Sequence, residues 1–471
     1  MAQPRSDWVL PAVGVVALVT ALRWVLLAFD RTDLFVDESQ YWLWGQSYAF
    51  GYFSKPPLIA WLIGTVTTLA GSDGQFWIRM PGAALHGGTA LILGAIAARL
   101  HSPRAAFWVA GTYVTLPFAA LGGLMISTDT VMAPFFAAAL LFHLRLTRDH
   151  RWQDAILTGV MLGLACLAKY AGIYFLTGAV VAAILHRDLR PSVWNWLVLL
   201  VSFAVVMMPN ILWNQSHNFA TVAHTVDNVG WIEGGHPLAQ LQIGDALKFL
   251  ASQIGVFGPV TLAALIVGLV RRRTLHLAAF VVPVLAIVTL QAVLDDAYAN
   301  WALTAYFAGT IIATVTLLPH PGWQVASLAT NGAICLALPL LTVFPQTGPD
   351  GAPLLARYLG RAEMSLALIA MAKATGAQAI VASDRDVIAD LFYTGRDARI
   401  AFYTPRPTGQ PDNHYEQSHA VPPDLAAPVL YVARKPPRCP AAPLALPHSG
   451  AYSRAKLAAY LVSPSCLPTT D

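Results

Sequence analysis

The stretch DESQYWLW (residues 37–44) and the turn GYFSKPP (residues 51–57) follow the first apolar run of the sequence. Together they hold two carboxylates, one ammonium group and a band of aromatic side chains. A charged side chain at the centre of a bilayer costs about 2.5–3.5 kcal/mol on insertion scales, whereas Tyr and Trp favour the interface between lipid and water. The stretch therefore predicts a loop that the surrounding apolar segments hold at a membrane surface.

Composition supports this interpretation. Of 471 residues, 56% are hydrophobic and 11% are charged, and the mean hydropathy is +0.56, whereas ordinary soluble domains have roughly 25% charged residues. The chain is therefore expected to be a polytopic membrane protein. The formal net charge is only +4, and no run of Lys or Arg suggests a nucleic-acid partner. Phosphate-loop, dinucleotide, zinc-protease and nucleophile-elbow motifs are missing from the sequence.

Eleven apolar segments predict membrane spans. The first, about Trp8 to Phe29, is too long for a signal-peptide core and is expected to be retained with its amino end in the cytoplasm. The segment Pro56 to Ala70 is shorter than the ~20 residues that cross a bilayer, so we expect it to lie along the interface. The remaining candidate spans are about 76–98, 105–122, 128–146, 153–168, 170–186, 192–212, 247–270, 275–294, 300–318 and 323–344.

Charge in the loops predicts the orientation. Arginines gather in alternate loops, at positions 99 and 104, 145 to 151, 187 and 190, and 271 to 273. The opposite loops, around 122–127, 213–244 and 295–300, contain no Lys or Arg. Because basic loops stay on the cytoplasmic side, the acidic-aromatic loop and the tail after residue 344 are expected on the outer side.

The tail, residues 345–471, is predicted to be a small α/β domain that follows a membrane domain of residues 1–344, whose outer catalytic loop is 30–75. Four short β-type runs (Ala379–Ser383, Arg399–Tyr403, Val429–Ala433 and Leu457–Val462) alternate with a helical stretch near Val387–Tyr393. Cys439 and Cys466 are either a disulfide or two free thiols in an oxidising compartment. Cys166 and Cys335 lie in apolar spans and are expected to be packing residues.

Asp37, Glu38 and Lys55 are the first candidates for chemistry. Acidic residues favour the amino ends of helices, so Asp37 and Glu38 also have a purely structural interpretation as a helix start. Lys55, however, follows within one loop, in a turn that two prolines stiffen. A carboxylate and an ammonium group that converge on a membrane face suit a base acting near an anionic lipid phosphate.

Asp129 and Lys169 each allow two interpretations. Asp129 is either the N-cap of the span that begins near Thr128 or a second outer carboxylate. Lys169, with Tyr170 beside it, is either buried near mid-membrane or placed where two short spans meet at the outer surface. A lysine at such a junction costs less free energy than a lysine buried near mid-membrane. At the junction it could bind a phosphate as a point charge.

The long outer loop supplies further polar candidates, which either line a substrate cleft or are solvated. These are Trp213, Asn214, His217, His224, Asp227, Glu233 and His236. The spacing of the three histidines matches no standard metal site. Asp295, Asp296, Asn300 and Trp301 are weaker candidates of the same kind.

The order of these motifs resembles that of the bacterial polyprenyl-phosphate-sugar-dependent transferases. The matching motifs are Asp-Glu-x-x-Tyr-Trp at 37–42, Gly-Tyr-Phe-x-Lys-Pro-Pro at 51–57, Ser-Thr-Asp at 127–129 and Lys-Tyr at 169–170. That group includes the aminoarabinose transferase of lipid A and galacturonosyl transferases of lipopolysaccharide, and it is related to protein O-mannosyltransferases. The resemblance covers about residues 10–310 and implies an all-α polytopic membrane protein with the C-type glycosyltransferase fold, in the inner membrane of a Gram-negative bacterium.

Family roles carry over residue by residue as implications of that resemblance. Asp37 matches the family's proposed catalytic carboxylate, Asp129 its second outer acid, and Lys169 a further phosphate-side lysine. Tyr41 matches the tyrosine of the first motif, and Tyr52 and Lys55 match loop residues that meet the donor phosphate. Gln40 and Ser54 stand where the aminoarabinose enzyme has an arginine and a glutamate, which puts that donor, and any metal the glutamate would help hold, in doubt. The candidate set comprises the catalytic residues Asp37, Asp129 and Glu38 and the substrate-binding residues Tyr41, Tyr52, Lys55, Lys169, Tyr170, Asn214 and His217.

The expected reaction moves a sugar from a polyprenyl phosphate to a lipid or glycan hydroxyl of the envelope. Asp37 would deprotonate the acceptor while Lys55 and Lys169 stabilise the departing phosphate, and a single displacement would invert the anomeric carbon. Membrane lipids are further partners. The sequence identifies no cofactor with certainty, and a divalent metal is left open. A rival interpretation is a transporter or flippase of lipid-linked glycans, which would place ionisable groups near the midplane between repeated bundles. A third is a structural partner whose tail binds other envelope proteins.

Overall fold

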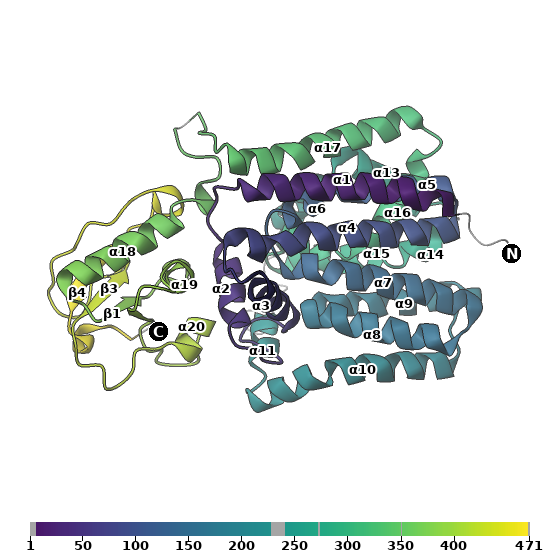
Figure 1. Cartoon of the computed structure of the whole chain (residues 1–471). Helices are drawn as coiled ribbons and strands as arrows, with labels where there is room; N and C mark the ends of the chain where they lie inside the picture. The colour runs from purple at the N-terminus through teal and green to yellow at the C-terminus, as the bar shows by residue number, and fades with distance from the viewer. Residues whose placement is uncertain (1–5, 228–240, 272–273, 350, 470–471) are drawn as a thin grey trace. The chain divides into compact units, whose positions relative to one another are not determined.

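The computed structural model describes residues 6–227, 241–271, 274–349 and 351–469 (Figure 1). Contacts divide the chain into two compact units. We call the first the helical unit; it comprises Met1–Ala28, Lys55–Ile59 and Arg79–Pro339. The second, the mixed unit, comprises Phe29–Ser54, Ala60–Ile78 and Leu340–Asp471.

The helical unit is built from apolar helices, as the hydropathy predicts. They are α1 (Val9–Ala28), α4 (Gln75–Leu100), α5 (Pro103–Thr115), α6 (Pro117–Gly122), α7 (Thr128–Asp149), α8 (Trp152–Ala168), α9 (Tyr174–Leu185), α10 (Val193–Ser216), α11 (Ala220–Asp227), α12 (Ile243–Phe257), α13 (Pro259–Leu269), α14 (Leu275–Ala278), α15 (Val282–Leu294), α16 (Ala305–Leu317) and α17 (Pro321–Val343). Among the described residues, six helical segments are long and apolar enough to cross a membrane, or seven if α12 and α13 form one span. The chain is therefore a multi-pass membrane protein, whereas the number of eleven spans stays a prediction.

Residues 247–270, which the sequence predicts to be a span, form parts of two helices rather than one. α12 and α13 meet at Gly258 at an angle of 110°. Gly258 has φ +83°, a conformation that favours glycine, and a Cβ there would meet the side-chain oxygen of Asn331. Pro259 then begins α13, where its missing N–H needs no helical partner. The segment is therefore a bent pair of helices, and its assignment as one of the membrane spans stays a prediction.

The stretch around Lys169 forms two short helices, as one of the two alternatives predicts, whereas the place of Lys169 at the outer surface stays a prediction. α8 ends at Ala168, Lys169 is extended with φ −156°, and a 3₁₀ turn (Tyr170–Ile173) leads into α9. α7, α8 and α10 lie side by side (Figure 1). Gly159 of α8 faces the backbone of α10, where a Cβ would meet the carbonyl oxygen of Leu199. This close approach fixes the helices that carry the polar residues described below.

The mixed unit contains the predicted four-stranded sheet. Its strands are β1 (Ala379–Ala382), β2 (Ala401–Tyr403), β3 (Val429–Ala433) and β4 (Ala458–Val462), in the order β2-β1-β3-β4. β1 is parallel to β2 and β3, and β4 is antiparallel to β3. The sequence prediction of these strands is confirmed to within two residues at each end.

Helices cover the sheet according to the alternation of side chains in its strands. Ile380 and Ala382 of β1 belong to one buried cluster with α18 (Arg361–Thr375) and α19 (Arg385–Thr394). Ala379 and Val381 belong to a second cluster, which includes Cys466. A disulfide joins Cys439 and Cys466, which decides between the two alternatives for these residues. α18 was not predicted, and a short helix α20 (His414–Ser418) completes the unit.

The acidic-aromatic loop packs with the tail in this unit. It forms α2 (Val36–Gly45), and residues 58–70 form α3 (Leu58–Ala70). α2 packs against α19. The amide of Asp33 donates to the carbonyl of Tyr358 at 2.8 Å, and the Asp33 carboxylate accepts from the amide of Arg361 at 2.8 Å. Two segments more than 300 residues apart in sequence are thus joined by hydrogen bonds of the backbone and side chain of Asp33.

Candidate active site

Asp37 lies in the first turn of α2, and the tail contributes its cation. The side chain of Asp37 is 43% exposed, and its Oδ1 accepts a hydrogen bond of 2.6 Å from Nη2 of Arg385. The same guanidinium donates to Oε1 of Gln40 from Nη2 at 2.9 Å and from Nε at 3.2 Å. Gln40 in turn donates to Oγ of Ser54 at 3.4 Å. Arg385 therefore bridges two side chains that stand one turn apart on α2.

The charges of this pair compensate each other. Burial disfavours the charged guanidinium of Arg385, but Asp37 outweighs that effect and holds the pKa of Arg385 above its ordinary value. Among the residues that the structure describes, Oδ2 of Asp37 has no hydrogen-bond partner. One carboxylate oxygen is thus held, and the other is available to a ligand.

Three other candidates of the loop, Glu38, Tyr41 and Tyr52, are buried. Glu38 is 1% exposed, and its Oε2 accepts from the amide of Phe35 at 2.9 Å, which is the helix-start role. The Tyr41 ring packs at 5.7 Å from that of Trp44, and the Tyr52 ring stacks on Trp44 at 4.9 Å. The Tyr52 hydroxyl is within hydrogen-bond distance of the carbonyls of residues 44 and 47, and burial raises its pKa to about 12. These contacts shape the loop, and a role of the three residues toward substrate stays a prediction.

In the helical unit, Asp129 and Lys169 form an ion pair. Nζ of Lys169 lies 2.8 Å from both carboxylate oxygens of Asp129, and Nδ2 of Asn300 donates to Oδ2 at 2.8 Å. The Asp129 side chain is 9% exposed and that of Lys169 is 19% exposed. Ser127, rather than Asp129, is the N-cap of α7, since its Oγ accepts from the amide of Thr130. The cap interpretation of Asp129 is therefore wrong, and its carboxylate is used for Lys169.

Asn300 is held in place by a second layer of polar contacts. It lies in a 3₁₀ turn, Ala299–Ala302, whose first carbonyl accepts from Nε2 of Gln253 at 3.2 Å. The Gln253 carbonyl oxygen accepts from the hydroxyl of Tyr306 at 2.7 Å. Both side chains are buried, so the turn that presents Asn300 rests on a fixed support.

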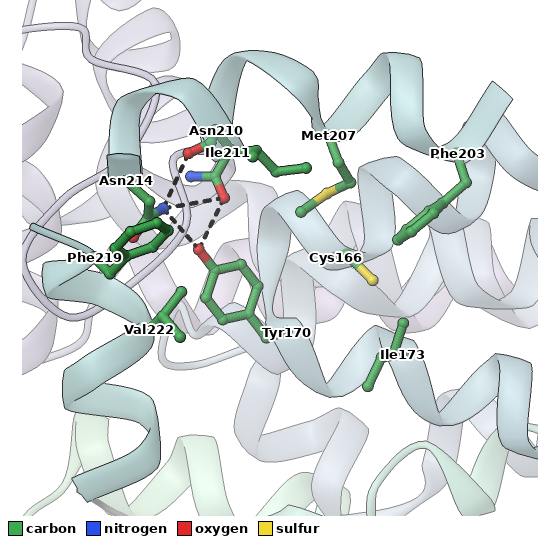
Figure 2. A pocket seen from close by; sticks show the side chains of 10 residues that line it. All are labelled: Cys166, Tyr170, Ile173, Phe203, Met207, Asn210, Ile211, Asn214, Phe219 and Val222. Carbon is green, nitrogen blue, oxygen red and sulfur yellow. Dashed lines mark hydrogen bonds between the residues drawn. The ribbon is translucent and has the colours of Figure 1, made fainter. Parts of the chain in front are cut away.

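Tyr170, the residue after Lys169 in the sequence, lines a cavity of about 300 Å³ (Figure 2). The Tyr170 hydroxyl donates to Oδ1 of Asn210 at 2.8 Å and accepts from Nδ2 of Asn214 at 3.2 Å. The asparagines stand one turn apart on α10, and they form the polar corner of an otherwise apolar cavity (Figure 2). The lining residues are Cys166, Tyr170, Ile173, Phe203, Met207, Asn210, Ile211, Asn214, Phe219 and Val222.

The last two residues of the candidate set are His217 and Lys55. His217 is exposed, and its ring stacks on Trp213 at 4.0 Å. Lys55 is partly buried in the turn before α3. Glu233 and His236 lie outside the described residues. Within the described part of the chain, no three His, Cys, Asp or Glu side chains form a group that could hold a metal ion.

Sequence reasoning did not find Arg385 or Asn210. Arg385 stands between two aspartates at a helix start, which is a common surface pattern and carries no signal of a partner in α2. Asn210 has a visible signal, because Asn210 and Asn214 are spaced four residues apart within an apolar span. Asn300 was only a weak candidate, yet it contacts Asp129 directly.

Comparison with known proteins gives four findings. The family model of dolichyl-phosphate-mannose-protein mannosyltransferases matches residues 54–213. The lipid A galacturonosyltransferase RgtD of Rhizobium johnstonii is 40% identical over 474 residues, which cover 97% of this chain and 99% of that protein. The crystal structure of ArnT from Cupriavidus metallidurans in the apo state has a TM-score of 0.63 at 14% identity and covers 99% of this chain and 100% of that chain. The structure of the same protein bound to undecaprenyl phosphate has a TM-score of 0.61 at 14% identity and covers 91% and 93% of the two chains.

Proposed function

The chain belongs to the C-type membrane glycosyltransferases, the family of the rhizobial lipid A galacturonosyltransferase, and we propose from this premise that it transfers a galacturonosyl group from a polyprenyl phosphate to lipid A. The observation that carries the proposal is the 40% identity to that relative over almost the whole of both chains. The chain is a glycosyltransferase, and the carrier and structural-partner interpretations are not retained.

The proposed reaction is a single displacement. The acceptor hydroxyl gives its proton to Oδ2 of Asp37 while its oxygen attacks the anomeric carbon from the face opposite the phosphate. The bond between the anomeric carbon and the phosphate oxygen breaks, and polyprenyl phosphate leaves with the electron pair. Product and donor then have opposite anomeric configurations.

Two lysines are proposed to stabilise the departing phosphate. Lys169 donates two hydrogen bonds to Asp129, which leaves one N–H of its ammonium group for a phosphate oxygen. Lys55 is proposed to act with it, because the turn that carries it is stiffened by Pro56 and Pro57. Asp129 holds Lys169 in place, and preorganised charge of this kind supplies much of the catalytic effect in transfer reactions.

The other candidate residues have supporting roles in the proposal. Tyr170 and Asn214, which line the cavity, are proposed to contact the donor lipid. Tyr41, Tyr52 and His217 are kept as substrate-side candidates, whereas the contacts of Glu38 support only a structural role.

The proposed topology has eleven spans in a bacterial inner membrane, with the amino terminus in the cytoplasm. The alternation of basic and neutral loops supports this orientation. Residues 1–344 are then the glycosyltransferase domain, and residues 345–471 form a periplasmic domain, where a disulfide between Cys439 and Cys466 is chemically stable.

The test is release of polyprenyl phosphate from a panel of labelled polyprenyl-phosphate sugars in membranes that contain the native protein. We expect turnover of the galacturonate donor with lipid A as acceptor, and a loss of about 10²–10⁴-fold for Asp37→Asn. Asp397→Asn, a change at a carboxylate that is 94% exposed, is the matched control and should retain activity. Turnover of a different sugar would overturn the donor assignment, and equal turnover by native protein and Asp37→Asn would remove Asp37 as the base.

A further inference from the structure

We infer that Arg385, contributed by the C-terminal domain, is a positioning residue for the carboxylate of Asp37. The inference rests on the proposed function, in which Asp37 is the base. It gives the C-terminal domain a role in the reaction, because Arg385 of this domain and Asp37 of α2 would act together.

The contacts of Arg385 are those of an orienting group. Its Nη2 binds one oxygen of Asp37 at 2.6 Å, and Nη2 and Nε both bind Gln40. Arginine presents its donors in a rigid planar fork, so a guanidinium fixed on Gln40 can hold the Asp37 carboxylate in a single orientation. Gln40 is 2% exposed, so this anchor is itself immobilised by packing.

The helix that carries Arg385 is fixed at its first residue. Asp384, the N-cap of α19, accepts from the amide of Asp386 at 3.0 Å. Asp384 is also bound by the guanidinium of Arg434, with Nη2 at 2.7 Å and Nε at 3.0 Å. A capped helix start that is tied to a neighbouring strand end places the next side chain, Arg385, with little freedom.

α2 and α19 are further joined at their other ends. The rings of Trp42 and Tyr393 meet edge to face at 5.1 Å. Both also bind Asp73, Trp42 through the carboxylate at 2.8 Å and Tyr393 through the carbonyl oxygen at 2.9 Å. The two helices therefore form one platform, on which the separation of Asp37 and Arg385 is set.

A carboxylate base at a half-exposed position is not held in one orientation by packing. Asp37 is 43% exposed, and a free aspartate rotates about two side-chain bonds. Since Arg385 binds Oδ1, Oδ2 is left for the acceptor hydroxyl. A nearby cation makes a carboxylate less basic, so the benefit of Arg385 is geometric: it holds the base where the proton is transferred.

The test compares kcat and KM for the native protein, Arg385→Ala, Arg385→Lys and the control Arg396→Ala. Arg396 lies just beyond α19, where it binds the carbonyl of Tyr393 and does not contact Asp37. We expect Arg385→Ala to lower kcat by about 100-fold with little change in KM, as misplacement of a catalytic group does. Arg385→Lys should recover part of the loss, and Arg396→Ala should match the native protein.

A double variant separates positioning from mere stability. If Arg385 acts only through Asp37, adding Arg385→Ala to Asp37→Asn should cause no further loss of kcat, because no base is left to orient. A structural role would reduce the activity of both backgrounds by the same factor. That result, a rise in KM with kcat unchanged, or native kcat in Arg385→Ala would each overturn the inference. Absence of turnover by the native protein would instead refute the proposed function and the inference with it.

Discussion

Removing the carboxylate of Asp129 should destabilise the helical unit, because Lys169 and Asn300 would lose their common partner. Asp129 accepts three hydrogen bonds of 2.8 Å, and its side chain is 9% exposed. Breaking a buried ion pair by deleting one partner costs about 3–5 kcal/mol, most of it from the charge left behind. Since Lys169 is 19% exposed, the lower end applies, and we expect Asp129→Ala to reduce the free energy of unfolding by about 3 kcal/mol.

A double-mutant cycle measures this coupling directly. Lys169→Met alone should also destabilise the protein, since it leaves the Asp129 carboxylate buried without its cation. The variant with both changes should lose less than the sum of the single losses, with a coupling energy of about 2–3 kcal/mol. The assay is equilibrium unfolding in mixed micelles of a mild detergent and dodecyl sulfate, followed by Trp fluorescence.

The exposed pair Asp245 and Lys248 is the matched control. Its N–O distance is 2.7 Å, close to that of the buried pair, but the Lys248 side chain is 81% exposed. Solvent screening should therefore leave its cycle without measurable coupling. Losses for Asp129 and Lys169 that add to within about 0.5 kcal/mol would refute the reasoning, since they would show two independent sites.

Three further predictions concern the rest of the chain. In Gly258→Ala the alanine must adopt φ +83°, so the free energy of unfolding should fall by at least about 1–2 kcal/mol and gel filtration should yield less monodisperse protein. Gly255→Ala, which has open space around the new Cβ, should cause neither change. Replacing Cys439 and Cys466 by Ser should destabilise the C-terminal domain by about 3–4 kcal/mol, because their bond closes a loop with a sequence separation of 27; reductant should shift thermal unfolding of the native protein equally. Burial raises the pKa of Asp390 to about 6 from 3.8, so the folded state retains a proton that the unfolded state releases. Stability should therefore fall by about 3 kcal/mol as pH rises from about 4 to 6, and Asp390→Asn should abolish this slope in unfolding curves measured across that range.

The sheet could be predicted from the sequence because its signal is local. The run Val429–Ala433 is apolar, rich in β-formers and bounded by prolines and charges, and it is β3 without change of bounds. α18 was missed although Met364, Leu368 and Ala372 recur at helical spacing. The bend at Gly258 could not be predicted from the Gly-Pro pair alone. The contact at this position comes from Asn331 on α17, which is more than 70 residues away in the sequence.

The candidate site was predictable only in part. Charge in an apolar sequence is a strong signal, and it singled out Asp129 and Lys169, which the structure joins in one ion pair. Their third partner, Asn300, is neutral and so gave a weaker signal. Arg385 could not be found, because a single sequence does not say which of many polar surface residues is brought to α2 by folding.

The bond between Asp37 and Arg385 also has a consequence for biosynthesis. The two residues are 348 positions apart, and translation proceeds at about 5–20 residues per second, so Arg385 is made about 17–70 s after Asp37. During that interval the nascent chain already contains α2 with Asp37 but lacks Arg385, the cation that binds Asp37. A chain that ends before residue 385 would lack this partner of Asp37, so we expect full activity only when synthesis of the chain is almost finished.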